Sequence, residues 1–280
     1  MKKGTYYLIL TLLLVVFGAS AFFVGSYFLE GRKQAQQFGE LSDLVNEAQN
    51  AAKETTDPAA STEASDPTGA QTEPTGETDP AETTVATEPQ MLPGYKELYE
   101  RNPDTIGWLK ILNSVVDYPV MQTPNAKDYY LQRDFNKEDS KRGCLYVREE
   151  CDVFAPSDNV TIYGHTMADG SMFAYLHEYI DKEVWDQNSL IFFDTLYEYH
   201  TYKIFAVFKT TATLGEGFTY HRMEWAKDEA EFDQFIATCK DLAFYETGVT
   251  PEYGDKIICL STCEYSQDNG RLVVAAVRIS

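Results

Sequence analysis

Cys263 and Arg271 are the residues of this sequence whose types and spacing first suggest chemistry. Cys263 ends the run Leu-Ser-Thr-Cys, and Arg271 follows eight residues later at the head of the apolar run Leu-Val-Val-Ala-Ala-Val. A strand over 256–262, a polar turn over 264–270 and a strand over 271–279 would form a hairpin that makes the two residues neighbours. A guanidinium there favours the thiolate and can stabilise a developing oxyanion, as cysteine-based acyl transfer requires.

His165 is the candidate for the base that such chemistry also needs. The sequence holds only four histidines, and His165 ends the strand-like run Asn-Val-Thr-Ile-Tyr-Gly-His. Gly164 would let the backbone turn sharply and present the imidazole at a strand end. His177 falls in an expected helix, and His200 and His221 lie in polar, aromatic-rich surroundings without a comparable placement.

These residues occur in motifs that resemble a known family. Ile-Tyr-Gly-His-Thr-Met-Ala-Asp-Gly-Ser-Met-Phe around His165, Leu-Ser-Thr-Cys and Arg271 resemble the sortases, transpeptidases that attach proteins to Gram-positive cell walls, and class B most strongly. The likeness covers most of 93–280, including an entry segment over 95–111. It places the family's histidine, nucleophile and arginine on His165, Cys263 and Arg271.

The resemblance implies a reaction and its partners. The expected intermediate is a thioester on Cys263, formed from a sorting signal near a surface protein's carboxyl terminus and cleaved after Thr. The acceptor is an amine of peptidoglycan precursor or of a pilin lysine. His165 would protonate the departing amine and deprotonate the incoming one. Whether the thiol and imidazole rest as neutral groups or as an ion pair stays open.

Four further residues are candidates for substrate binding. Ser261, Thr262 and Glu264 flank the nucleophile, with strand packing and turn polarity as the alternative interpretation. By the resemblance, Leu131 is a candidate for the wall of the substrate groove, against the alternative of a core residue. No cofactor is expected, and no metal site, because no histidine lies near the cysteines in a known zinc-ligand spacing.

Two other functions remain open at this point. A secreted cysteine hydrolase would use the same two residues, but the papain-like families place the cysteine before the histidine, whereas His165 precedes Cys263 here. A tethered surface module without enzymatic activity is the second alternative. It predicts ordinary reactivity for the Cys263 thiol.

The elements that must position these residues follow from the hydrophobic pattern of 93–280. Short segments rich in β-branched and aromatic residues predict a β-rich α+β domain. The resemblance adds a closed sortase-type β-barrel with peripheral helices. Strands are expected at 107–112, 115–121, 143–147, 159–163, 190–194 and 200–213 besides the hairpin, and helices at 93–101, 169–179 and 227–242.

The first 53 residues predict a membrane anchor and a helix. Residues 5–29 carry no charge and are long enough to cross a bilayer, so 1–31 is expected to be an uncleaved anchor, with a signal peptide cleaved after Ala19-Ser-Ala21 as the alternative. A juxtamembrane helix is expected over 32–53, with Phe38, Leu41, Val45 and Ala48 on one face. The resemblance implies a single-pass protein of the cell membrane with an extracellular catalytic domain.

Residues 54–92 predict a disordered acidic tether rich in Thr and Pro. Residues 54–90 hold nine acidic and no basic side chains, and the catalytic region adds 31 acidic against 18 basic ones. A chain with a net charge of −21 is unsuited to binding nucleic acid, whose phosphates require clustered cations. The five cysteines offer no good disulfide pair, since Cys144 and Cys151, like Cys259 and Cys263, should lie too far apart.

Overall fold

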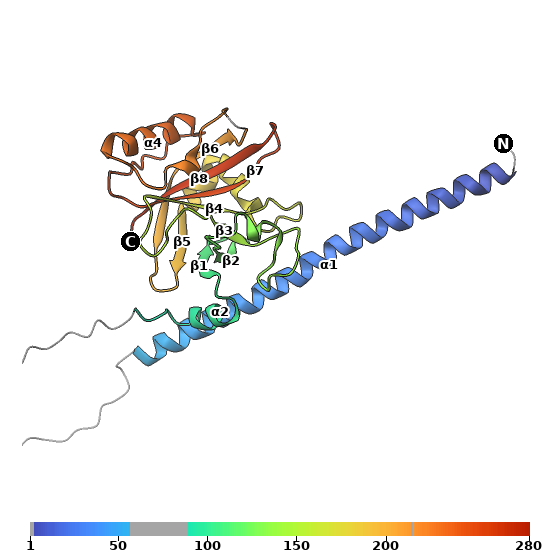
Figure 1. Ribbon diagram of the computed structural model, residues 1–280, viewed down its shortest axis with the longest axis horizontal. Helices are drawn as coiled ribbons and strands as arrows, with labels where there is room; N and C mark the ends of the chain where they lie inside the picture. The colour runs from blue at the N-terminus through green and yellow to red at the C-terminus, as the bar shows by residue number, and fades with distance from the viewer. Residues whose placement is uncertain (1–2, 57–88, 214) are drawn as a thin grey trace, which may run out of the picture.

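The computed structural model describes residues 3–56, 89–213 and 215–280, which form a closed β-barrel lying against one long helix (Figure 1). Around the barrel the strands follow the order β1-β2-β3-β4-β7-β8-β6-β5. The strands are β1 (Thr105–Lys110), β2 (Asp117–Met121), β3 (Leu145–Val147), β4 (Asn159–Tyr163), β5 (Leu190–Thr195), β6 (Thr201–Thr211), β7 (Ile257–Cys263) and β8 (Gly270–Arg278). The predicted barrel is confirmed.

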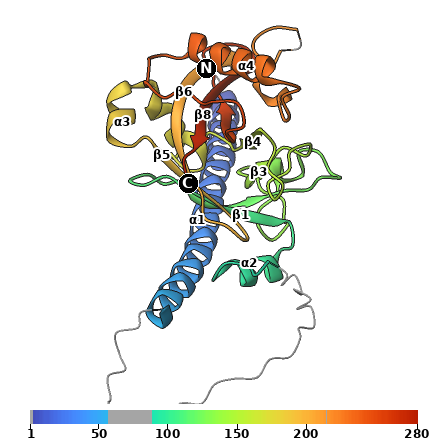
Figure 2. The same ribbon diagram turned by 90° about the vertical axis from the view of Figure 1, so that its left-hand side faces the viewer.

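Alternation along the strands fills two apolar layers. On β8, Leu272, Val274 and Ala276 belong to the main core, which includes the barrel interior, whereas Val273 and Ala275 face a second cluster outside it. Helix α4 (Glu229–Leu242) covers that second cluster (Figure 2). Both faces of these strands are therefore buried, which explains their nearly continuous runs of β-branched and small apolar residues.

The strand register brings the candidate residues to one edge of the barrel. Antiparallel β7 and β8 pair Cys263 directly with Arg271, which confirms the predicted hairpin. Strand β4 runs parallel to β7 and pairs Tyr163 with Ser261. Because β4 ends there, Gly164 and His165 continue beside the last residues of β7.

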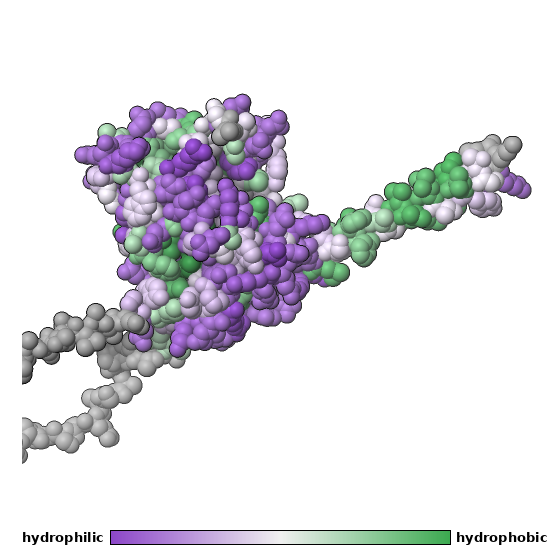
Figure 3. Space-filling model, viewed as in Figure 1, coloured by the Kyte–Doolittle hydropathy of each residue, from purple (hydrophilic) through white to green (hydrophobic). Residues whose placement is uncertain are grey.

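The expected anchor and juxtamembrane helix are one uninterrupted helix, α1 (Lys3–Thr56). Its amino-terminal half projects away from the barrel and is strongly hydrophobic (Figures 1 and 3). Among the described residues, α1 is the one helix long and apolar enough to span a membrane. Its second half buries Phe38, Leu41 and Val45 in the core, so the barrel domain includes residues that precede the linker.

Most of the predicted disordered tether, residues 57–88, lies outside the described residues. Helix α1 reaches the barrel before the linker begins, and the chain returns beside the same helix. A Cβ on Gly94 would lie 2.9 Å from the Val45 Cα, and the Leu92 amide donates to the Leu196 carbonyl at 2.8 Å. Helix α1 thus leads directly from the predicted anchor to the barrel, and residues 92–94 lie against the same helix and barrel.

The remaining helices agree with the prediction except in one region. Helices α2 (Tyr95–Arg101) and α4 lie where they were expected. The helix expected over 169–179 is instead a loop followed by the 3-10 helix η2 (Phe173–Ile180), because Met172 adopts φ 57° and ends any helical path there. The pattern did not predict α3 (Lys182–Gln187), η1 (Tyr129–Gln132) or η3 (Tyr220–Arg222).

Candidate active site

A cleft of about 310 Å³ lies where β4, β7 and β8 end. Leu131, His165, Cys263 and Arg271 all contribute to its lining, although they come from four segments of the chain. The structure thus brings the predicted nucleophile, base and cation into one cleft. Tyr220 of η3 forms part of the same wall.

Cys263 differs from the other cysteines in its exposure. All five are free thiols, but Cys144, Cys151, Cys239 and Cys259 are buried, whereas Cys263 is partly accessible at the end of β7. Burial raises the pKa of the four other thiols, that of Cys151 to about 11. They are therefore inert hydrophobes at neutral pH, and Cys263 is the thiol that a reagent can reach.

A backbone carbonyl orients the His165 ring. Its Nε2 lies 2.7 Å from the carbonyl oxygen of Leu131. Because a carbonyl only accepts, Nε2 must carry the hydrogen, and in the neutral ring Nδ1 is then the free base. Leu131 therefore contacts the site through its main chain as well as lining the cleft with its half-exposed side chain.

Two threonines join the end of β4 to the end of β7. Thr262 donates from its hydroxyl to the Gly164 carbonyl at 2.7 Å, and Thr166 donates to the Cys263 carbonyl at 3.2 Å. The two hydroxyl oxygens are 2.8 Å apart. The Thr262 hydroxyl is thus engaged between the strands, and its residue is only 2% exposed.

His177, to which sequence reasoning gave no role, lies directly behind the nucleophile. Its Nε2 is 3.2 Å from the Cys263 carbonyl oxygen and 3.1 Å from the Thr166 hydroxyl. The imidazole therefore helps to hold the main chain at Cys263. No sequence signal revealed this contact, because η2 crosses the strand ends from a distant part of the chain.

Arg271 brings a positive charge that no described carboxylate neutralises. Its Nη1 donates to the carbonyls of Gly270 at 2.9 Å and Asn269 at 3.3 Å, and it forms no ion pair among the described residues. These contacts fix the guanidinium without cancelling its charge. It can therefore stabilise an oxyanion that forms beside Cys263.

Ser261 lines the cleft, as Thr262 does, whereas Glu264 belongs to the turn beside it. Ser261 is buried, with its hydroxyl 2.6 Å from that of Tyr220, whose pKa burial raises to about 12. Glu264 does not line the cleft. Burial opposes ionisation of its carboxyl, but hydrogen bonds from Ser266 and Lys209 prevail and lower its pKa, so this side chain organises the 264–270 turn.

The lining of the cleft also includes three residues of basic type that the sequence did not single out. Arg148, His221 and Arg222 all line it. Arg148 donates to the His221 carbonyl and to the Glu224 carboxylate. Burial, together with the charges of Arg148 and Arg222, lowers the pKa of His221, so this second imidazole is neutral at pH 7. The described residues contain no cluster of three or more potential metal ligands.

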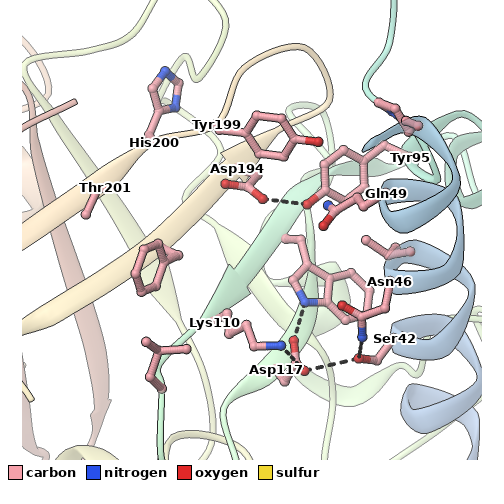
Figure 4. Close-up of a pocket in the computed structure, with 16 residues that line it drawn as sticks. Ser42, Asn46, Gln49, Tyr95, Lys110, Asp117, Asp194, Tyr199, His200 and Thr201 are labelled. Carbon is pink, nitrogen blue, oxygen red and sulfur yellow. Dashed lines mark hydrogen bonds and ion pairs between the residues drawn. The ribbon is translucent and has the colours of Figure 1, made fainter. Parts of the chain in front are cut away.

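A second cavity, of about 670 Å³, lies between α1 and the barrel and shares no lining residue with the cleft (Figure 4). Its polar groups pair with one another. Asp117 accepts hydrogen bonds from Trp108 at 2.6 Å and Lys110 at 2.9 Å, and Asp194 accepts one from Tyr95 at 2.7 Å. It is larger than the cleft but no cysteine lines it, so we place the candidate active site in the cleft.

Comparison with known proteins places the fold and this cleft in context. The model of the sortase domain matches residues 109–279. The chain is 32% identical to sortase B of Listeria monocytogenes over 64% of its own length and 71% of the relative's, and 30% identical to sortase B of Staphylococcus aureus over 66% and 74%. A solved Staphylococcus aureus sortase B–substrate complex has a TM-score of 0.71 and 22% identity, covering 90% of this chain and 99% of that one.

Proposed function

Because this chain belongs to the sortase family and is a cysteine transpeptidase of the class B type that acts on sorting signals, we propose that Cys263, His165 and Arg271 carry out its reaction. The observation that carries the proposal is the strand register. It pairs Cys263 with Arg271 and leaves His165 at the end of the strand parallel to β7. Nucleophile, acid–base group and cation thus face one cleft.

In the proposed first half-reaction, the Cys263 thiolate adds to the carbonyl carbon of the scissile peptide. The electron pair of the carbonyl moves onto oxygen, where Arg271 faces the negative charge. The C–N bond then breaks as His165 gives a proton to the leaving nitrogen, and a thioester remains on Cys263. The Leu131 carbonyl holds the ring through Nε2, so Nδ1 carries the transferred proton.

The second half-reaction uses the same groups in reverse. An amine adds to the thioester carbonyl, His165 takes a proton from its nitrogen, and the thiolate departs as the new amide forms. We propose cleavage after Thr, with an amine of peptidoglycan precursor or of a pilin lysine as acceptor. The solved substrate complex of the Staphylococcus aureus relative supports a peptide bound in the corresponding fold.

We further propose that α1 anchors the protein in the cell membrane, with the barrel on the extracellular face. The most apolar 18-residue stretch of α1 is 0% buried in the described structure. Lipid would cover this surface.

The test uses the full chain in nanodiscs, since α1 contributes to the core. Peptides that contain Thr are incubated with it, with and without a glycine-type amine, and the products are identified by mass spectrometry. We expect a thioester adduct on Cys263 and ligation after Thr that requires the amine. Cleavage that is indifferent to added amine would instead indicate a hydrolase, and absence of any adduct would leave a surface module without activity.

A further inference from the structure

Residues 27–34 of α1 contact a short segment of the barrel domain, Ser140–Cys144, that leads into β3. The Gln34 side chain donates to the Gly143 carbonyl at 2.7 Å, in a buried position. The Arg142 guanidinium lies over the Tyr27 ring, 4.8 Å from its centroid. Gly31 gives Arg142 its space, because a Cβ there would lie 2.4 Å from Nη2.

Arg142 links α1 to the loop that follows His165. Its side chain is 2% exposed, donates to the Ser171 hydroxyl at 2.8 Å and pairs with Asp169 at 2.7 Å. The Arg142 guanidinium beside Asp169 holds the pKa of that carboxyl at about 2, below its usual value, so the pair is charged at neutral pH. The loop closes where the Phe173 amide donates to the His165 carbonyl at 2.9 Å.

Gly143 links α1 to the Leu131 carbonyl, which contacts the His165 ring from the other side. A Cβ on Gly143, at φ 58°, would lie 2.5 Å from the Tyr130 carbonyl oxygen and 2.6 Å from that of Leu131. The Cys144 amide donates to the Tyr130 carbonyl at 3.0 Å. The close approach of this backbone therefore sets the place of the Leu131 carbonyl, which accepts from the His165 ring.

We propose that residues 27–34 of α1 help to build the active site, because through Arg142 and Gly143 they position His165 from both sides. Arg142 is in this sense a positioning residue, since it acts through the loop and never reaches the reacting atoms. The inference rests on the proposed role of His165. It makes the membrane-proximal helix a requirement for proton transfer as well as for attachment.

Gly31→Ala in the full chain in nanodiscs tests the inference. The new methyl group displaces the flexible end of Arg142, so the fold can accommodate it while the pair with Asp169 is lost. We expect kcat of amine-dependent ligation to fall about tenfold with KM within about twofold, since misplacing a catalytic group slows the chemical step. The matched control is Gly39→Ala on the same helix, where a Cβ meets nothing within 4 Å.

A second variant separates positioning from folding. Arg142→Met should lower kcat to a similar extent, and Gly31→Ala should then add nothing further, because residues that act through one contact are not additive. Equal kcat in Gly31→Ala and Gly39→Ala would overturn the inference, as would additive losses or a loss that follows the melting temperature. An inactive wild-type chain would instead reject the proposed function.

Discussion

The cleft around Cys263 and the cavity between α1 and the barrel differ in what their charged groups do. In the cavity, Asp117 pairs with Lys110 and accepts a hydrogen bond from Trp108, so its charge is neutralised by contacts that hold the fold together. In the cleft, Arg271 bonds only to carbonyls and keeps its charge available beside an accessible thiol. The cavity has about twice the volume, which teaches that an unneutralised charge beside a reactive group indicates chemistry better than size does.

Removing the nucleophile should have the largest effect. Cys263→Ala should lower ligation by at least about 10³-fold, because the thioester can no longer form. Turnover of sorting peptides with added amine, followed by mass spectrometry, measures the loss. Cys239→Ala, on the buried face of α4, is the matched control and should keep its activity per folded molecule. Iodoacetamide should label Cys263 alone in the folded chain, and labelling of a buried cysteine at a similar rate would contradict the assigned burial.

Removing the free charge of the cleft should come next. Arg271→Met should lower kcat by about 10²-fold, the usual loss for an oxyanion-stabilising group. Arg278→Met is the matched control at the other end of β8, where the guanidinium faces His200 at 3.2 Å. Steady-state kinetics should show Arg278→Met within about twofold of wild type. Equal losses in the two variants would mean that Arg271 acts through strand stability.

Truncating a side chain of the cavity should lower stability and leave the reaction rate unchanged. Trp108→Ala removes a side chain that is 4% exposed and leaves the hydrogen bond to Asp117 unmade. We expect the free energy of unfolding to fall by about 3 kcal/mol, with kcat/KM per folded molecule unchanged. Thermal unfolding measures the first quantity, with the exposed Trp225→Ala as control. A fall in kcat/KM at full folding would show that the cavity is coupled to the cleft.

The smallest expected effect is the pH dependence at Asp194. Burial raises the pKa of this carboxyl above its ordinary value. Its protonated form favours the folded state, and that contribution is lost as pH rises through the folded pKa. Asp194→Asn should therefore raise Tm at pH 7, by about 2 °C, and the difference should shrink as pH falls toward 4. A difference that grows on acidification would contradict the sign.

The sequence predicted the parts of the site that depend on short-range register. Only the short turn over 264–270 separates Cys263 from Arg271, so alternation and turn chemistry were enough to pair them. Gly164 also marked the turn at His165. The β-branched runs likewise predicted most strands. What failed was the helix over 169–179, where apolar spacing concealed a tight loop that contacts from Arg142 hold in place.

The supports of the site could not be predicted, because they depend on contacts between distant segments. Arg142 looks like a surface residue in the sequence, yet it is buried beneath α1. The partner of His165 is a backbone carbonyl, and a main-chain group carries no sequence signal. The docking of α1 was also missed, since an amphipathic helix before a long acidic segment gives no sign of where its apolar face will pack.

If α1 is anchored as proposed, its continuity would also govern how the enzyme meets its substrates. A helix of 54 residues is about 80 Å long and has no break at the point where it leaves the bilayer in the proposed orientation. The barrel packs along the second half of this helix, so no flexible joint would let it rotate relative to the membrane-spanning half. Its cleft would keep a fixed orientation and height above the membrane while the protein diffuses laterally, so encounters with membrane-bound partners would become a search in two dimensions between molecules that are already oriented.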